Sequence, residues 1–204
     1  IAAAKVAGIE KIYRIGGAQA IAALALGTDQ IPKVDKIIGP GNIFVAEAKK
    51  QLFGEVGIDS IAGPSEILIL ADSSSNPETI AWDLMAQSEH DTDASGVLVS
   101  DSDEIIASVK EIISTEIDSL ERSSIIKESI NSNGLIIKID NFSEAKQIVN
   151  KIAPEHLHLA FDHANYQDEN SLIAGLILKG EDSANSFSDY VLGPSHILPT
   201  NSSS

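Results

Sequence analysis

The segment that decides the fold reads "EILILADSSSNPETIAWDLMAQSEH" and covers residues 66–90. It begins with an almost unbroken apolar run, which is typical of a strand that is covered on both faces. Asn76 can then accept hydrogen bonds from free backbone N–H groups, and Pro77 suits the first position of a helix. We therefore predict a strand over 66–71 and a helix over 77–90, joined by a polar turn.

Short apolar runs alternate with amphipathic stretches on both sides of this segment. Several runs are rich in Ile, Leu and Val without polar alternation, which favours parallel strands buried between helices. Beyond the first pair, we expect strands over residues 11–15, 35–38, 96–100, 135–139, 157–161 and 176–178. We expect further helices over residues 18–26, 43–53, 103–120, 143–151 and about 164–174. The predicted fold class is α/β, with mostly parallel sheets and helices on both faces.

The composition excludes several classes of partner and site. The 204 residues carry 14 Lys and Arg against 30 Asp and Glu, a formal net charge of -16. This charge repels phosphate backbones and anionic lipid headgroups, so we expect no nucleic-acid partner and no membrane association. The chain has no cysteine, so any metal must be held by nitrogen and oxygen ligands. The lack of cysteine also fits a reducing cytoplasm.

The polar cluster "QSEHD", residues 87–91, ends the helix of the opening segment. Helical spacing from Ile80 through Leu84 places Gln87 on the inward apolar stripe, where its amide needs a hydrogen-bond partner. His90 follows three residues later and lies close beside it. The cluster is either a solvated helix end, with His90 favoured by the helix dipole, or one half of a metal site.

The motif "APEHLHLAF", residues 153–161, holds two adjacent candidate proton acceptors. Pro154 ends a helix, so Glu155 and His156 stand at the entrance to a strand, at a sheet edge where α/β proteins gather substrate sites. Adjacent Glu and His side chains can act as separate bases because their environments can set their two pKa values apart. Strand alternation puts His158 on the face of His156, and we interpret His158 as a packed or surface residue.

A third motif, "SDYVLGPSHILPT" at residues 188–200, holds Asp189 and His196 in a Gly- and Pro-rich loop that an ordinary turn also explains. Together with Gln87 and His90, Asp189 would offer a set of hard nitrogen and oxygen donors. A structural zinc site usually has four protein ligands, and only three candidates stand out here. An open position is what a metal needs in order to bind a substrate directly.

Two glycine-rich turns, "RIGGAQA" at residues 14–20 and "IGPGNIF" at 38–44, each follow an expected strand and open an expected helix. Backbone N–H groups at such helix starts can receive a phosphate. Neither turn has the GxGxxG spacing of a dinucleotide site, and tight α/β turns explain the glycines equally well. The turns therefore leave the binding of a nucleotide open.

In combination these motifs resemble those of one known family, the histidinol dehydrogenases. The resemblance covers nearly the whole chain and is carried, in order, by "GGAQAIAALALGT", "IPKVDKIIGPGNIFVAEAKKQLFG", "GIDSIAGPSEILILAD", "QSEHDTDA", "APEHL" and "SDYVLGPSHILPT". Several long motifs in one order, with similar spacing, identify the chain as a member of that family.

The resemblance implies roles for the site residues. Zinc would be held by Gln87, His90 and Asp189, with a fourth ligand, a histidine, coming from the partner subunit. Glu155 would be the base that activates water, and His156 would take the proton of the substrate hydroxyl. The residues in contact with L-histidinol would be Ser65, Gln87, His90, His156 and Asp189. Contacts to NAD would come from Gln19 and Asn42, and His196 would have a supporting role near the pocket.

The implied activity is the zinc- and NAD-dependent, four-electron oxidation of L-histidinol, through L-histidinaldehyde, to L-histidine. The resemblance also implies a cytoplasmic homodimer with shared active sites. The implied fold has two related, incomplete Rossmann-like domains, one inserted within the other. Residues 1–63 would complete the inserted domain, and residues 64–204 would form the second part of the outer domain, with the zinc and the catalytic residues.

By the same resemblance, we expect the chain to be a fragment without an N-terminal portion and a C-terminal arm, and therefore impaired in activity. Three other interpretations stay open. One is a dehydrogenase of the same family that oxidises another small alcohol, such as a sulfonated diol. The others are a noncatalytic remnant that binds zinc and, less in keeping with the motifs, a zinc hydrolase.

Overall fold

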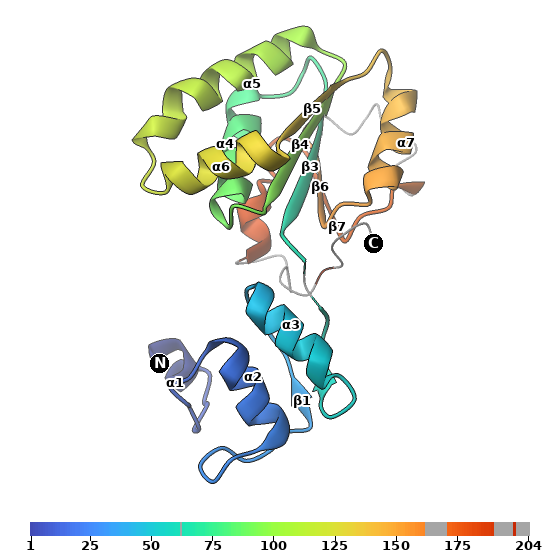
Figure 1. Ribbon diagram of the computed structural model, residues 1–204. Coiled ribbons are helices and arrows are strands. Elements are labelled where there is room, and N and C mark those ends of the chain that lie inside the picture. Colours follow the sequence, from blue (N-terminus) through green and yellow to red (C-terminus); the bar gives the residue numbers. More distant parts are fainter. Residues whose placement is uncertain (62, 162–170, 190–197, 199–204) are drawn as a thin grey trace. The chain divides into compact units, whose positions relative to one another are not determined.

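The computed structural model describes residues 1–61, 63–161, 171–189 and 198. The chain divides into two compact units, Ile1–Ala62 and Gly63–Ser204. The division falls next to the Gly-Pro pair at residues 63 and 64, where the family resemblance also places the domain boundary. Each unit has its own sheet and its own apolar core (Figure 1).

A five-stranded parallel sheet forms the centre of the larger unit (Figure 1). Its strands stand in the order β5-β4-β3-β6-β7 and span Leu135–Lys138, Ser95–Ser100, Glu66–Ala71, His156–Leu159 and Leu176–Lys179. The first strand, β3, pairs in parallel with both β4 and β6, so the chain builds the sheet outward on one side and then on the other. This is the order of the first five strands of a Rossmann-type sheet.

Helices cover both faces of this sheet (Figure 1). One face carries α4, α5, the 3₁₀ helix η1 and α6, and the other carries α7; they span Pro77–Glu89, Asp103–Glu116, Ile117–Ser119, Ser123–Asn133 and Phe142–Ile152. Alternate side chains of β3 enter two cores, with Ile67 and Ile69 toward α4 and α5, and Leu68 and Leu70 toward the opposite face. Both faces of β3 are therefore buried, which explains its lack of polar alternation. None of the helices in the described part of the chain is both long and apolar enough to cross a membrane.

The smaller unit packs helices against a short parallel pair of strands. Its elements α1, α2, β1, α3 and β2 span Ala2–Val6, Gly17–Leu26, Lys36–Ile37, Ile43–Leu52 and Gly57–Ile58. The core of this unit is formed by the buried side chains of Ile21, Ala25, Ile37, Val45 and Val56. Asn42 caps α3 by accepting a hydrogen bond from the Val45 N–H at 3.2 Å, which sets the direction in which the chain leaves the "IGPGN" turn.

A buried ion pair holds the start of that glycine-rich turn. Lys49 Nζ lies 2.7 Å from Asp59 Oδ1 and donates to the Gly39 carbonyl oxygen at 2.5 Å. The Gly39 N–H donates in turn to Asp59 Oδ2 at 2.8 Å, at a backbone φ of 134° that favours glycine. Burial raises the pKa of Asp59, but the hydrogen bonds from Lys49 and from Gly39 outweigh it and lower the pKa to about 2.

The predicted α/β class with mostly parallel sheets is confirmed, but one predicted strand is wrong. Residues 11–15 form no strand, and Ile12, Tyr13 and Ile15 are exposed. A strand needs a neighbour that pairs with its backbone groups, and local residue pattern does not report whether one is present. The helix expected over about 164–174 falls mainly on residues 162–170, which lie outside the described residues.

The helix α6 was not predicted from the sequence pattern. Ser and Asn make up much of this helix, and both have low intrinsic helix propensity because their side chains compete for backbone hydrogen bonds. Tertiary contacts compensate: Ile126 packs with Met85 and Ile117 in a small core, and Ser129 Oγ donates to the Ala94 carbonyl oxygen at 2.8 Å. The helix is therefore stabilised by packing rather than by local preference.

We predict that Asn76→Ala destabilises the larger unit by about 1 kcal/mol. Asn76 Oδ1 accepts from the N–H groups of Glu78 at 2.9 Å and Thr79 at 3.4 Å, and alanine leaves both without that acceptor. Urea unfolding of the 204-residue chain measures the loss. Ser73→Ala, at an exposed position of the preceding turn, is the matched control and should unfold like the parent. Equal stability of Asn76→Ala and the parent would contradict the assigned cap.

We predict that Asp59→Asn destabilises the smaller unit at pH 5 and that its difference from the parent narrows toward pH 2. The folded pKa of about 2 is below the ordinary 3.8, so the carboxylate contributes its full stability above pH 3.8 and loses it as pH falls through 2. Denaturant unfolding at several pH values, followed by a probe in this unit, measures the difference. The exposed Asp29→Asn serves as control, and a difference that is constant with pH would refute the linkage.

Candidate active site

Three of the residues singled out in the sequence meet at the amino-terminal edge of the five-stranded sheet. Ser65 directly precedes β3, Glu155 directly precedes the neighbouring strand β6, and His156 is its first residue. The register pairs Ile67 with His156. Glu155 Oε2 accepts a hydrogen bond from the Glu66 N–H at 3.2 Å, which links the entrances of the two strands.

The turn before β6 gives Glu155 and His156 their positions. The preceding helix, α7, ends at Ile152 and is followed by Ala153, whose φ of 46° places it in the left-handed region that is uncommon for residues other than glycine. Pro154 then prevents the helix from continuing. The two following side chains point into the protein, and each residue is only 5% exposed. Two ionisable groups are thus held, largely out of water, at adjacent positions.

The contacts of His156 indicate which ring nitrogen carries the hydrogen. Nδ1 lies 3.3 Å from the Glu66 carbonyl oxygen and 3.6 Å from Glu155 Oε2. A carbonyl oxygen only accepts, so Nδ1 donates in this contact, and the neutral ring then has its lone pair on Nε2. This tautomer suits the ring to accept a proton at Nε2.

Gln87 points inward, as its place on the apolar stripe of α4 predicts. It is 1% exposed, and its Oε1 accepts from Asn185 Nδ2 at 3.0 Å. In the described part of the chain, Gln87 Nε2 has no hydrogen-bond partner. An unsatisfied buried amide atom is costly, and it marks a direction in which a further group can bind.

His90, at the end of α4, is exposed, and its ring is oriented by its own helix. Nδ1 lies 3.1 Å from the Ala86 carbonyl oxygen, so this nitrogen is the donor. The neutral ring then offers Nε2 as a ligand atom, which is the arrangement usual for histidines that bind metals. An imidazole nitrogen of His90 and an amide oxygen of Gln87 are donors of the kind that a divalent cation such as zinc accepts.

The remaining residues of the predicted metal site are described only in part. Asp189 ends the 3₁₀ helix η4 (Asn185–Asp189), but its side chain is not among those described. His196 lies outside the described residues. Among the side chains that are described, no group of three or more His, Cys, Asp or Glu is placed to hold a metal. The ligand set of Gln87, His90 and Asp189 therefore stays a prediction.

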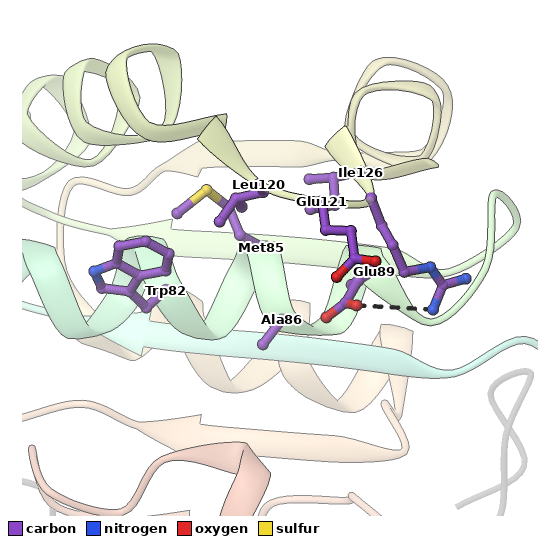
Figure 2. Close-up of a pocket in the computed structure, with 8 residues that line it drawn as sticks. Trp82, Met85, Ala86, Glu89, Leu120, Glu121 and Ile126 are labelled. Atoms are coloured by element: carbon purple, nitrogen blue, oxygen red, sulfur yellow. Dashed lines mark ion pairs between the residues drawn. The ribbon is translucent and has the colours of Figure 1, made fainter. Parts of the chain in front are cut away.

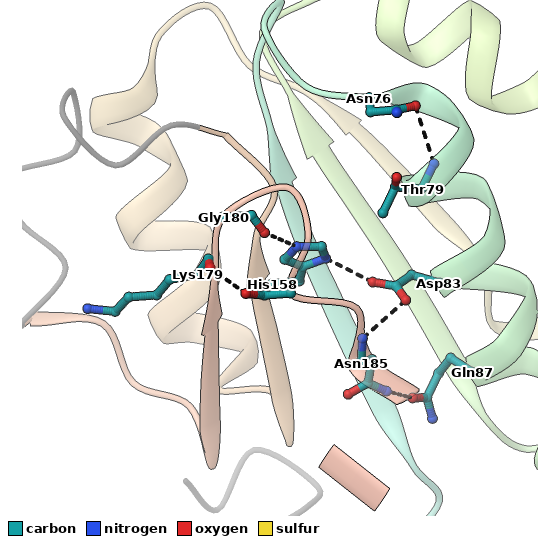
Figure 3. Close-up of polar contacts among 9 residues, drawn as sticks. Asn76, Thr79, Asp83, Gln87, His158, Lys179, Gly180 and Asn185 are labelled. Atoms are coloured by element: carbon teal, nitrogen blue, oxygen red, sulfur yellow. Dashed lines mark hydrogen bonds and ion pairs between the residues drawn. The ribbon is translucent and has the colours of Figure 1, made fainter. Parts of the chain in front are cut away.

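A line of buried polar residues, which was not predicted from the sequence, connects η4 to the sheet (Figure 3). Asp83 Oδ2 lies 2.9 Å from His158 Nδ1, and Asp83 Oδ1 accepts from the Asn185 N–H at 3.1 Å. His158 is fully buried, so the interpretation of a packed residue is confirmed. A signal was present, because Asp83 lies three residues after Ile80 on the inward stripe, where a carboxylate needs partners.

The site residues lie at the sheet edge opposite to the one that the usual rule indicates. Ligands of open α/β sheets bind outside the carboxyl ends of the strands. Here α4 follows β3 and runs back over the sheet, so its last residues reach the amino-terminal edge just before β4 begins at Ser95. The Ser95 N–H donates to the Ser65 carbonyl oxygen at 3.0 Å, which links the entrances of β3 and β4. A site at a sheet edge was expected, but the rule used to expect it does not describe these residues.

The residues predicted to contact NAD belong to the smaller unit. Gln19 is exposed in the first turn of α2, and Asn42 is exposed at the start of α3. Asn42 has a structural role as helix cap, which leaves its amide nitrogen available. Only the "IGPGNIF" turn follows a strand, since the strand expected before "RIGGAQA" does not form.

An apolar pocket lies elsewhere, between α4 and residues 120–126 at the start of α6 (Figure 2). Trp82 and Met85 line it together with Leu120, and Glu89 forms an ion pair at 3.8 Å with Arg122 at its rim. None of the predicted site residues whose side chains are described lines this pocket. The pocket is therefore separate from the candidate active site.

The larger unit defines the class of protein: a Rossmann-like α/β domain with adjacent acid–base side chains at one sheet edge. The family model for histidinol dehydrogenase matches residues 1–204. Histidinol dehydrogenases of Clostridium acetobutylicum and Pseudomonas syringae pv. syringae are 51% and 46% identical to the chain over 200 residues. The chain therefore belongs to the histidinol dehydrogenase family.

These alignments cover 98% of this chain but only 46% and 45% of the two relatives, so the chain spans about half of their length. A crystal structure of histidinol dehydrogenase from Elizabethkingia anophelis superimposes with a TM-score of 0.90 at 39% identity, over 98% of this chain and 46% of that one. Gamma-glutamyl phosphate reductase from Thermotoga maritima matches with a TM-score of 0.51 at 13% identity, over 83% and 45% of the chains. This weaker likeness shows the fold alone.

Proposed function

We propose that the complete gene product containing this chain oxidises L-histidinol, through L-histidinaldehyde, to L-histidine. The observation that carries the proposal is the buried pair Glu155 and His156, adjacent at the entrance of β6, in a chain of the histidinol dehydrogenase family. Two successive oxidations need two proton acceptors, because an alcohol loses its hydroxyl proton first and a water molecule must later be deprotonated. The pair supplies both.

His156 is assigned to the first oxidation. Its Nδ1 contact to the Glu66 carbonyl leaves Nε2 as the basic atom, so Nε2 takes the hydroxyl proton of histidinol while the hydrogen on carbon leaves as hydride. Glu155 is assigned to the second. Its carboxylate is anchored by the Glu66 N–H and takes a proton from the water that adds to the aldehyde carbon, which leaves the hydrate as an anion. This anion then loses the hydrogen on its carbon as a second hydride and becomes the carboxyl group.

Zinc and NAD are part of the proposal. Gln87, His90 and Asp189 would hold the zinc, and Ser65, Gln87, His90, His156 and Asp189 would surround histidinol. Gln19 and Asn42 would contact NAD. When bound, zinc would anchor the amino and imidazole nitrogens of the substrate, and NAD would accept a hydride in each oxidation. The buried, inward position of the Gln87 amide and the orientation of the His90 ring, which leaves Nε2 as the acceptor atom, support this ligand set.

The proposal includes the organisation of the whole enzyme. We assign residues 1–63 to the end of an inserted Rossmann-like domain and residues 64–204 to the second part of the outer domain. The enzyme would be a cytoplasmic homodimer with shared active sites. Because the chain spans about half of its relatives, the 204 residues alone are expected to have weak activity or none.

We predict that Glu155→Gln in the complete enzyme slows oxidation of the aldehyde by about 10²-fold or more, and oxidation of histidinol much less. Glutamine keeps the size and the acceptor for the Glu66 N–H but cannot take a proton from water. Single-turnover assays that start from histidinol or from histidinaldehyde separate the two steps. Glu181→Gln, at an exposed turn, is the matched control. If Glu155→Gln slows both oxidations equally, the assignment of Glu155 to the second oxidation alone is wrong.

We predict that His90→Ala weakens zinc binding strongly, because it removes a ligand itself. The loss of affinity should exceed the ~10–100-fold that is typical when only a residue hydrogen-bonded to a ligand is removed. Chelator competition followed by metal analysis of the complete enzyme measures the change without relying on turnover. Asp93→Asn, exposed in the next turn, should bind zinc like the parent. Zinc binding that is unchanged in His90→Ala would exclude His90 from the ligand set.

A further inference from the structure

We propose that Asp83 and Asn185 are positioning residues that join α4 to η4 and thereby align two proposed zinc ligands, Gln87 and Asp189. The inference rests on the proposed function, because it concerns the geometry of that zinc site. It assigns a role to residues that lie outside the "QSEHD" and "SDYVLGPSH" motifs and that belong to neither the proposed zinc ligands nor the proposed substrate contacts.

Two hydrogen bonds connect α4 with η4, although these segments are about a hundred residues apart in the chain (Figure 3). The Asn185 N–H donates to Asp83 Oδ1 at 3.1 Å, and Asn185 Nδ2 donates to Gln87 Oε1 at 3.0 Å. Asp83 lies one helical turn before Gln87 on α4, and Asn185 opens the 3₁₀ helix that ends at Asp189. A single residue, Asn185, is thus bound by two successive turns of α4.

Asp83 is itself held in place by the sheet. His158, on β6, lies 2.9 Å from Asp83 Oδ2 through Nδ1 and 3.0 Å from the Gly180 carbonyl oxygen through Nε2. Because the carbonyl only accepts, Nε2 carries a hydrogen, and the ring is fixed at both ends. Asp83 is 4% exposed and His158 fully buried, so this support lies in a region where hydrogen bonds are strong and costly to lose.

The hydrogen bond between the Asn185 and Gln87 amides also determines which Gln87 atom, oxygen or nitrogen, faces outward. The oxygen and nitrogen ends of an amide side chain have nearly the same shape, so the amide can turn over within the same space. In the orientation of the structure, Gln87 Nε2 has no partner in the described part of the chain. If both amides turn over, Gln87 Nε2 donates to Asn185 Oδ1, the amide contact is kept, and Gln87 Oε1 takes the outward position. A bound cation would favour this orientation because it needs an oxygen ligand.

The test compares zinc affinity and ligand geometry in variants of the complete enzyme. Asn185→Ala keeps the backbone N–H on Asp83 but removes the amide that contacts Gln87. Asp83→Ala removes the acceptor that holds the Asn185 backbone. Asp83→Asn is the conservative variant: its oxygen still accepts from Asn185, and its amide can donate to Nδ1 of a neutral His158. Ser186→Ala, exposed in the same 3₁₀ helix, is the matched control.

We expect Asn185→Ala and Asp83→Ala to weaken zinc binding by about 10–100-fold in chelator competition, while Asp83→Asn and Ser186→Ala stay close to the parent. The absorption spectrum of the cobalt-substituted enzyme should change in Asn185→Ala, because the spectrum reports the geometry of the ligands. Thermal unfolding of the metal-free variants separates this effect from folding. Should Asp83→Ala fail to fold, Asn185→Ala still decides the matter.

The outcomes separate this inference from the proposed function. A parent enzyme that binds zinc and oxidises histidinol, with an Asn185→Ala variant equal to it in zinc affinity and cobalt spectrum, overturns the positioning role alone. The positioning role is also overturned if Asn185→Ala lowers only the stability of the metal-free enzyme. A parent that binds no zinc overturns the proposed site and this inference together.

Discussion

The parallel pairing of β3 with both β4 and β6 is the constraint on which the rest of the larger unit depends. Because β3 lies between strands that are distant in sequence, its first residues meet the entrance of β6, and the Glu66 backbone binds both Glu155 and His156. The helix α4, which follows β3, runs back over the sheet, so Gln87 and His90 near its end lie at the same edge. A shift in this pairing by one residue would turn every side chain of β6 to the other face.

The face of the sheet under α4 combines an apolar core with a line of buried polar groups. Ile67, Ile69 and Leu84 form part of the core, while Asp83 and His158 satisfy each other within it. Burial of such groups is unfavourable unless each one finds partners, so the polar line costs stability compared with an apolar packing. The line of buried polar groups lies next to the amide of Gln87. Its cost in stability is therefore consistent with a role in holding the candidate site in one geometry.

Local sequence predicted some elements well because their signals are local. The apolar run of β3, the Asn76 cap and the Pro154 stop are read from neighbouring residues, and each is found as predicted. The failures have one cause. Residues 11–15, where a strand was expected, pair with no strand in the part of the chain that the structure describes. The helix α6 owes its stability to contacts with α4 and η1. Neither fact is encoded within the segment concerned.

For the candidate site, the sequence by itself determined which chemical groups are available: an adjacent Glu and His, an inward Gln, and no thiol ligand. The family motifs supplied the roles of these residues. Only the tertiary structure decided that the Glu155–His156 pair lies at the amino-terminal edge, and that Asn185 rather than a neighbour on α4 binds Gln87. The physical reason is that residue type sets what a side chain can donate or accept, whereas strand order and register set which distant group it meets.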